Sequence, residues 1–183
     1  MELTTARITL RDFTPDDRAA LGAYQSDPRY AEYYGPEEIG NERMVDLLDM
    51  FLRWSIERPR QNFQLAIIER DASPALIGCV GVRFKGLDEG VAEFGLELAP
   101  QRWGRGLATE AARALLSHAF RELDLRIAIA ISATQNHRVA RVLDKLGFHS
   151  TGTRAGADWM HGRGWNETEW RLTAKEWEDT QAG

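Results

Sequence analysis

The sequence predicts one α+β domain over residues 1–183, with about seven strands and about four helices. Its length is that of a single globular domain. Its composition, 43% hydrophobic and 28% charged, is ordinary for a folded protein. Strand-like and helix-like patterns both occur along the chain, with no repeat or linker between them. These observations exclude a disordered chain, a collagen and a coiled coil.

Seven segments predict strands, because apolar residues alternate or run continuously between turn-forming residues. They are Ala6–Phe13, Phe63–Glu69, Leu76–Phe84, Val91–Leu98, Arg126–Ser132, Phe148–Arg154 and Trp165–Leu172. Ser73-Pro74 predicts the turn between the second and third of them. The fifth is apolar on both faces, which predicts a strand buried between layers.

Four segments predict helices. The first opens at Thr14-Pro15, with a capping residue followed by proline at the first helical position. The second, Asn41–Ile56, has a helical apolar stripe. Gly106–Phe120 is rich in alanine and can pack closely on a sheet. Asn136–Leu146 predicts a short helix, with Asn136 as its candidate N-cap and Gly147 in the C-cap position.

Charge and cysteine content favour a soluble cytoplasmic protein. Lys and Arg number 23 against 28 Asp and Glu, a net charge of −5 that argues against a general nucleic-acid binder. Cys79 is the single cysteine, so we expect no internal disulfide and a reducing compartment. Residues 1–11 lack a signal pattern, and no apolar run approaches the ~20 residues that span a bilayer. We therefore expect neither a nucleic-acid partner nor a membrane partner.

The charge is unevenly distributed. Residues 14–50 hold nine acids and three arginines, a net charge of −6, so the rest of the chain is −5 − (−6) = +1. Residues 101–113 hold Arg102, Arg105 and Arg113 against one acid. One interpretation is solvated helix faces. The other is an acidic lip for a cationic substrate and a basic cradle for an anionic one.

Residues 100–106 join a strand to the alanine-rich helix and carry two glycines two positions apart. Glycine permits a tight turn and brings N–H groups close to a ligand. Free N–H groups at a helix start, beside Arg102 and Arg105, would form a phosphate site. The alternative is a plain strand-to-helix turn. A Rossmann fingerprint would need glycine at Thr109, and a Walker motif would need Gly-Lys-Ser/Thr, so neither is present.

The pattern Gln-x-x-Gly-x-Gly in this loop resembles the acyl-CoA pyrophosphate loop of the GNAT N-acetyltransferase superfamily. Further short sequence motifs resemble those of its ribosomal-protein-acetyltransferase (RimJ/RimL-like) branch. They are Ala92-Glu93-Phe94-Gly95, Leu98-Ala99-Pro100, Trp103–Ala111, Asn136 with Arg141–Phe148, and Trp165–Leu172 with Glu176-Trp177. The resemblance covers nearly the whole chain in order and spacing.

The resemblance implies the GNAT fold, a mixed, mostly antiparallel sheet that splays open in its middle, between the strand ending at Leu98 and the strand ending at Ser132. Acetyl-CoA would lie in the split as cosubstrate, with no metal. Its pyrophosphate would meet loop N–H groups, and its pantetheine would run beside residues 96–99 like an added strand. The implied cofactor-binding residues are Leu96, Leu98, Ala99, Arg102, Trp103, Gly104, Arg105, Gly106, Leu107, Ala108, Asn136 and Arg141.

The resemblance also implies an enzyme, an acetyl-CoA-dependent N-acyltransferase of class EC 2.3.1. A primary amine would attack the thioester directly in a ternary complex, which requires a base, an oxyanion donor and an acid for the thiolate. By resemblance, the backbone N–H near Leu98 is the oxyanion donor and Glu93 is the base. Strand alternation puts Glu93 and Glu97 on one face, so either carboxylate could face the split. Glu93 could instead order the sheet or bind the amine.

Two positions depart from the family pattern. Relatives carry a serine where this chain has Val139, and other branches carry a tyrosine where it has Leu143, so both usual acid hydroxyls are missing. The thiolate could leave unassisted, or the loop around His161 could contribute. The same departure keeps open a non-catalytic acyl-CoA-binding regulatory protein. A nucleotide-binding module of another type is disfavoured by the failed fingerprints. The four histidines have no metal-ligand spacing.

The expected acceptor is a cationic amine, either a protein N-terminus or a small molecule. The reason is that the acidic residues 14–50 should cover the acceptor side in this fold. Trp54 and Trp159 are candidates for that pocket, with the core as the alternative. The oligomeric state stays open, with a homodimer as the assembly considered.

Overall fold

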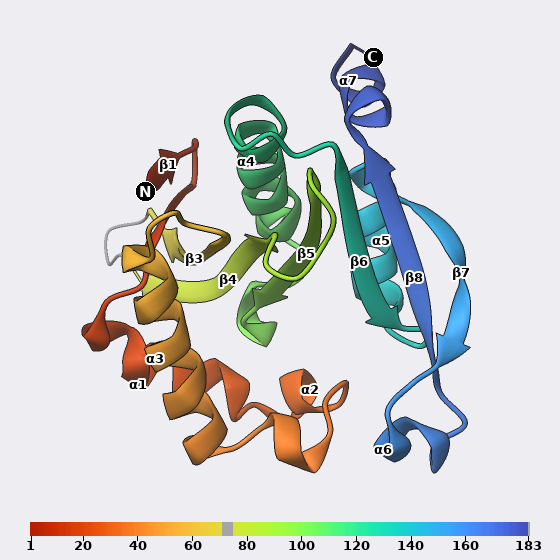
Figure 1. The fold of residues 1–183 in the computed structure, drawn as a ribbon. Coiled ribbons are helices and arrows are strands. Elements are labelled where there is room, and N and C mark those ends of the chain that lie inside the picture. Colours follow the sequence, from red (N-terminus) through yellow and green to blue (C-terminus); the bar gives the residue numbers. More distant parts are fainter. Residues whose placement is uncertain (71–74, 183) are drawn as a thin grey trace.

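The computed structural model describes residues 1–70 and 75–182, which fold around one central sheet (Figure 1). Within these residues the sheet has eight strands in the order β1-β2-β3-β4-β5-β6-β8-β7. They are β1 (Glu2–Thr4), β2 (Ile8–Asp12), β3 (Asn62–Glu69), β4 (Ala75–Arg83), β5 (Val91–Leu98), β6 (Ile127–Ala133), β7 (His149–Ala155) and β8 (Asn166–Thr173). The seven expected strands are present, and β1 is additional because three residues are too few to show a pattern. The turn expected at Ser73-Pro74 lies outside the described residues.

The same residues form seven α-helices. They are α1 (Arg18–Gln25), α2 (Pro28–Ala31), α3 (Asn41–Ile56), α4 (Leu107–Glu122), α5 (His137–Lys145), α6 (Asp158–His161) and α7 (Ala174–Ala182). Short 3-10 turns precede α1, α3 and α4, at Pro15–Asp17, Pro36–Glu38 and Pro100–Arg102. The four expected helices are α1, α3, α4 and α5. The other three escaped prediction because α2 and α6 have one turn each and α7 has a weak apolar stripe.

The sheet is mixed and splays in its middle. Every neighbouring pair of strands is antiparallel except β5 and β6, which are parallel. Their register covers three pairs, from Val91 opposite Ile127 to Glu93 opposite Ile129. Beyond Glu93 the two strands diverge, as Figure 1 shows. This confirms the expected mixed, mostly antiparallel sheet with a split beside Leu98.

Helices cover both faces of the sheet. Alternate residues of β3 show the division, because Leu65 and Ile67 pack with α4 whereas Ala66 packs with α1 and α3. The α5 and α7 helices lie on the α4 side, where Trp177 of α7 stacks on Phe120 at 5.8 Å between ring centroids. Cys79 is buried on the α1 side as a small core residue.

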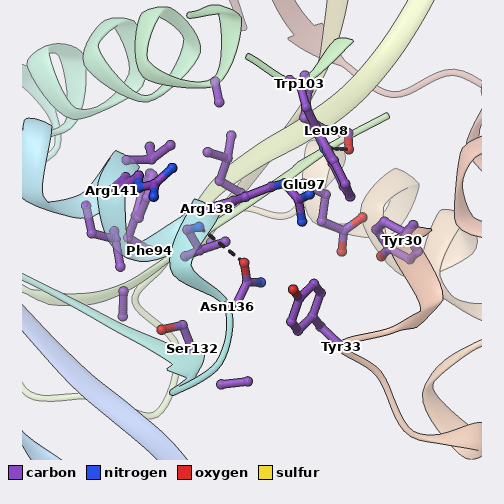
Figure 2. A pocket seen from close by; sticks show the side chains of 18 of the residues that line it. Tyr30, Tyr33, Phe94, Glu97, Leu98, Trp103, Ser132, Asn136, Arg138 and Arg141 are labelled. Atoms are coloured by element: carbon purple, nitrogen blue, oxygen red, sulfur yellow. Dashed lines mark hydrogen bonds between the residues drawn. The ribbon is translucent and has the colours of Figure 1, made fainter. Parts of the chain in front are cut away.

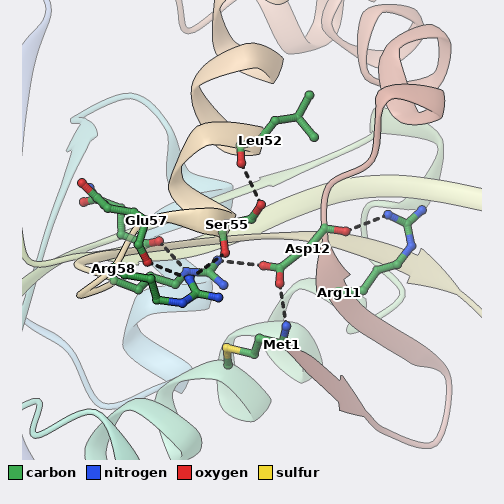
Figure 3. Close-up of polar contacts among 9 residues, drawn as sticks. Met1, Arg11, Asp12, Leu52, Ser55, Glu57 and Arg58 are labelled. Carbon is green, nitrogen blue, oxygen red and sulfur yellow. Dashed lines mark hydrogen bonds and ion pairs between the residues drawn. The ribbon is translucent and has the colours of Figure 1, made fainter.

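Two carboxylates fix the chain around β2 and the start of α1. Asp17 accepts hydrogen bonds from Arg11 on both oxygens at 2.7 Å, and from the Thr14 N–H at 2.7 Å. Asp12 accepts from Arg60 at 2.7 Å and from the Met1 amino group at 2.5 Å (Figure 3). Burial alone would raise the pKa of each carboxyl, but these hydrogen bonds lower both pKa values below their usual range. The network holds α1 against the sheet.

Candidate active site

A cavity of about 580 Å³ opens where β5 and β6 diverge. One wall comes from the end of β5, residues 102–109 and the α2 region, and the other from β6 and α5. Figure 2 shows this arrangement, with Arg138 and Arg141 on one side and Tyr30 and Tyr33 beside Glu97 on the other. Of the residues expected to bind the cofactor, all but Ala99 and Arg105 line this cavity. The split expected from the sequence is therefore a real pocket.

The loop before α4 has the backbone geometry of an anion site. Gly104 and Gly106 have φ values of +75° and +77°, in the left-handed region that favours glycine. A Cβ on Gly104 would meet no described atom within 4 Å, so backbone conformation, rather than lack of space, explains that glycine. The helix begins at Leu107, so the N–H groups of its first turn have no acceptor within the helix. Leu107 and Ala108 line the cavity, and their N–H groups fit a phosphate.

The two loop arginines are held by a buried acid. The carboxylate of Glu69, at the end of β3, is 7% exposed. It lies 2.5 Å from Arg102 Nε and 3.1 Å from Arg105 Nη1. Arg105 lies outside the cavity lining, and its carbonyl accepts a hydrogen bond from Arg7 at 2.8 Å. The expected basic cradle is thus partly neutralised within the protein, and Arg105 mainly fixes the loop.

Free positive charge at the cavity comes instead from α5. Arg138, Arg141 and Lys145 follow one another at helical spacing and all line the cavity. The guanidinium of Arg138 lies 4.6 Å from the centroid of the Trp103 ring, across the split. Arg141 was expected here, whereas Arg138 and Lys145 were not predicted, although the spacing of the three already places them on one helix face. Asn136 caps α5 through its side-chain oxygen, which accepts from the Val139 N–H at 3.2 Å.

The end of β5 presents backbone groups to the split. The Ala99 N–H donates to the Ile77 carbonyl at 2.7 Å, on the β4 side. Because successive N–H groups of a strand point to opposite edges, the Leu98 N–H points toward the split. The Leu98 carbonyl accepts a hydrogen bond from the Trp103 indole at 2.8 Å. Ala99 itself is buried in the core on the α1 side and is not among the residues that line the cavity.

The two candidate bases have different surroundings. Glu93 is 48% exposed, pairs with Arg83 at 2.8 Å and lies outside the cavity lining. The register explains this, because β6 still pairs with β5 at Glu93 and Arg83 lies directly opposite on β4. Glu97, four residues further on, lines the cavity in the open part of the split. The geometry therefore favours Glu97 over Glu93 as a base.

The carboxylate of Glu97 is oriented by the last turn of α1. Its Oε2 accepts from the Tyr24 hydroxyl at 2.9 Å and from the Gln25 amide at 3.2 Å. Burial raises the pKa of Tyr24 well above its usual value, and the nearby Cys79 and Glu97 add to this rise. Tyr24 therefore keeps its proton and donates it to the hydrogen bond. Tyr24 was not predicted, because its apolar surroundings resemble those of any core residue.

The far end of the cavity is aromatic and acidic. Its residues come from the α2 region, α6 and β8. They are Tyr30, Tyr33, Tyr34, Glu38, Met160 and Glu167. Trp54 packs beside Phe51 at 5.7 Å between centroids, and Trp159 lies outside the lining, so neither faces the cavity. The three tyrosines were not predicted as site residues, because the only sequence signal used from residues 14–50 was their negative charge.

No family-type hydroxyl acid stands at the two departing positions, where Val139 and Leu143 line the cavity with apolar side chains. The Ser132 hydroxyl is nearby but accepts a hydrogen bond from the Trp170 indole at 3.0 Å. His161 is exposed and faces Asp158 at 3.8 Å, away from the lining.

Among the residues described, no cluster of His, Cys, Asp or Glu could hold a metal ion. No helix in that part of the chain is long and apolar enough to cross a membrane.

Comparison with known proteins adds independent support. Residues 7–149 match the acetyltransferase (GNAT) domain. The chain is 31% identical over 151 residues to YoaA of Bacillus subtilis, an uncharacterised N-acetyltransferase, and the match covers 82% of this chain and 84% of YoaA.

Two solved structures share the fold. The spermidine N-acetyltransferase of Vibrio cholerae, in complex with CoA and spermine, has a TM-score of 0.76 and 19% identity, with 94% of this chain and 99% of that chain covered. The ribosomal-protein-S5-alanine acetyltransferase of Vibrio fischeri has a TM-score of 0.78 and 15% identity, with 97% and 98% covered. The same fold thus serves proteins named for different acceptors. With the domain match covering most of its length, this chain belongs to the GNAT acetyltransferase family and is an acyltransferase.

Proposed function

We propose that this protein moves the acetyl group of acetyl-CoA to a primary amine by direct attack in a ternary complex. The observation that carries this proposal is a single cavity with opposite charges at its two ends. Arg138, Arg141 and Lys145 stand near the start of α4, whereas Glu38 and Glu167 stand at the far end. A strand edge and the carboxylate of Glu97 lie between them. An anionic donor and a cationic acceptor would therefore meet at the end of β5.

On the donor side, the N–H groups at the start of α4 and the cations of α5 would hold the phosphates of CoA. The exposed edge of β5 at Leu96 and Leu98 would pair with the pantetheine amides in the manner of an added strand. Asn136 lines the same stretch and would border that arm. Twelve residues were expected from the sequence to bind acetyl-CoA. We keep ten of them in this role, leave out Ala99, and propose that Arg105 supports the loop.

In the reaction, the amine nitrogen attacks the thioester carbonyl, a C–N bond forms, and the C–S bond then breaks. Glu97 takes the amine proton directly or through one water molecule. The Leu98 N–H donates to the oxyanion that develops on the carbonyl. A carboxylate that is pre-oriented by Tyr24 and Gln25 needs little rearrangement for this role.

The sulfur leaves as CoA thiolate without a side-chain acid. Val139 and Leu143 supply no proton, and reference thiols titrate near ~8.5 whereas reference amines titrate near ~10.4. The thiolate is therefore the better leaving group in the tetrahedral intermediate even when it is not protonated. This route matches the apolar side chains at both positions.

The RimJ/RimL-like branch and a cytoplasmic location remain part of this proposal. The resemblance of the sequence motifs in residues 92–111 and 141–148 supports membership of this branch. The lone buried Cys79 suits a reducing compartment. A homodimer is the assembly to be tested by the mass of the protein in solution.

The test follows CoA thiol release from acetyl-CoA with a panel of amines. We expect release with at least one cationic amine, and a fall in kcat/KM of about 10²–10⁴-fold in Glu97→Gln, the size typical of a lost general base. Glu93→Gln is the matched control, with the same chemical change on the same strand face, and should stay within about threefold. Tight CoA binding without thiol release from any amine would contradict the proposal. Equal losses in both variants would contradict the choice of Glu97.

A further inference from the structure

Two segments from opposite walls of the split meet at the far end of the cavity. One runs from Glu32 to Gly35 after α2, and the other from Trp159 to Trp165 through α6. The Nη1 of Arg163 donates a hydrogen bond to the Glu32 carbonyl at 2.8 Å. Its guanidinium also lies 5.3 Å from the Trp159 ring centroid and 5.1 Å from that of Trp165. We call this set of contacts the clasp.

Ring packing closes the clasp further. Tyr33 stacks on Trp165 with centroids 5.8 Å apart, and Trp159 meets Trp165 edge-on at 6.1 Å. A Cβ on Gly35 would lie 2.5 Å from Cδ1 of Trp159, so the indole rests directly on the glycine backbone. The Gly35 N–H donates to Glu38 at 2.6 Å, which connects the clasp to the cavity wall.

The clasp joins the two halves of the molecule on either side of the split. The α2 segment belongs to the half of the molecule that contains β5, and α6 connects β7 and β8 in the other half (Figure 1). Tyr33 and Met160 line the cavity immediately inside the two segments. We call the loop before α4, residues 100–106, the donor loop. The end of the cavity opposite the donor loop is therefore bounded by contacts between the two halves.

The chemistry of this end suits a small cation. Among the described residues that line the cavity, the cationic side chains are Arg102, Arg138, Arg141 and Lys145, all in the donor loop or in α5. The far end has tyrosine rings and the carboxylates of Glu38 and Glu167, and both kinds of group attract ammonium groups. Glu167 also pairs with Arg154 at 2.9 Å, so Glu38 and the rings contribute most of this attraction. The whole cavity has about 580 Å³, within the range of one small-ligand site, and the donor's reactive arm must share it.

From these observations we infer that the clasp makes the acceptor end a closed chamber, which admits small cationic amines and excludes the N-termini of folded proteins. A protein N-terminus would have to thread between Tyr33 and Trp165 or break the bond from Arg163 to Glu32. This inference rests on the proposed function and narrows its acceptor class.

The experiment compares kcat/KM for diaminobutane, butylamine, a short peptide amide that begins with alanine, and a small folded protein with the same N-terminal residues. In wild type we expect kcat/KM for diaminobutane to exceed that for the folded protein by about 100-fold or more. It should also exceed that for butylamine, because the second ammonium group of diaminobutane meets the acidic end of the cavity. Arg163→Ala should narrow the ratio of diaminobutane to folded protein by about tenfold. Arg126→Ala, at an exposed arginine far from the cavity, is the control and should leave the ratio unchanged.

A second variant tests the clasp from the opposite wall. Gly35→Ala places a methyl group against Trp159 and should shift the ratio in the same direction as Arg163→Ala. Circular dichroism checks that both variants fold, and indole fluorescence reports the altered surroundings of Trp159 and Trp165. Equal wild-type rates on diaminobutane and the folded protein would overturn the inference, as would an unchanged ratio in both variants. Absence of thiol release with every acceptor would instead overturn the proposed function.

Discussion

Replacing Asp17 with asparagine should destabilise the protein through the start of α1, the helix that orients Glu97. The Asp17 carboxylate is 6% exposed and forms a two-point ion pair with Arg11, with both N–O distances at 2.7 Å. Asparagine keeps one oxygen and loses the charge. Each hydrogen bond to a charged group contributes about 1.5–3 kcal/mol, and breaking a buried pair costs about 3–5 kcal/mol.

Arg11 is 30% exposed and regains some hydration in the variant, so the lower end of this range applies. We expect the free energy of unfolding to fall by about 3 kcal/mol at pH 7, which for a chain of this size lowers Tm by about 6–12 °C. Urea denaturation followed by circular dichroism measures the free energy. The control is Asp16→Asn, at the exposed neighbouring acid, which should stay within about 0.5 kcal/mol of wild type.

The pH dependence gives a second check. Because the pKa of Asp17 is lowered in the folded protein, its contribution is complete above the unfolded pKa of about 3.9 and is lost as the pH falls through the folded value. The gap between wild type and Asp17→Asn should therefore be equal at neutral and mildly acidic pH and shrink below pH ~4. A gap under about 1 kcal/mol at pH 7, or one that persists undiminished in acid, would refute the reasoning.

Two further predictions concern the site. Arg141→Ala should raise the KM for acetyl-CoA about tenfold with kcat nearly unchanged, because it removes a cavity-lining cation that we propose binds the phosphates and takes no part in the chemistry. Steady-state kinetics checks this, and a fall in kcat at constant KM would contradict it. Tyr24→Phe should lower kcat by about tenfold, because it removes the shorter of the two hydrogen bonds to Glu97, while the KM for acetyl-CoA and the circular dichroism spectrum stay as in wild type. An unchanged kcat would show that this hydrogen bond does not orient the base.

The choice between Glu93 and Glu97 shows where sequence reasoning reached its limit. Alternation correctly placed both on one face of β5, but periodicity contains no information about where a neighbouring strand departs. The β6 register ends opposite Glu93, so that residue still lies in closed sheet and pairs with Arg83. Four residues later the split is open and α1 supplies Tyr24. A long-range feature, the divergence of two strands, therefore decides which carboxylate faces the cavity.

For the loop before α4, the backbone could be predicted from the sequence but the directions of its arginines could not. Its two glycines and its position before a helix specify the backbone, because positive φ and free N–H groups are local properties. The directions of Arg102 and Arg105 are not local, because both depend on Glu69, which is distant in sequence at the end of β3. The α5 cations lay within reach of prediction, since their spacing alone puts them on one face.

The acidic residues 14–50 show how tertiary structure sorts charge that looks uniform in sequence. Three of its nine acids form ion pairs with arginines, namely Asp17 with Arg11, Asp27 with Arg29 and Asp49 with Arg18. Of its nine acids, Glu38 is the one that lines the cavity among the described residues.

The acidic end of the cavity is instead assembled from separate parts of the chain. Glu38 follows α2 and Glu167 belongs to β8, and both line the same end of the cavity, where the clasp joins the two halves of the molecule. The proposed preference for a cationic acceptor thus depends on the closed chamber rather than on the composition of any segment. An open chamber would expose the same carboxylates to water, where salt and hydration weaken their attraction for an ammonium group. Closure and charge selectivity are therefore one property of this site, and loosening the clasp should weaken both.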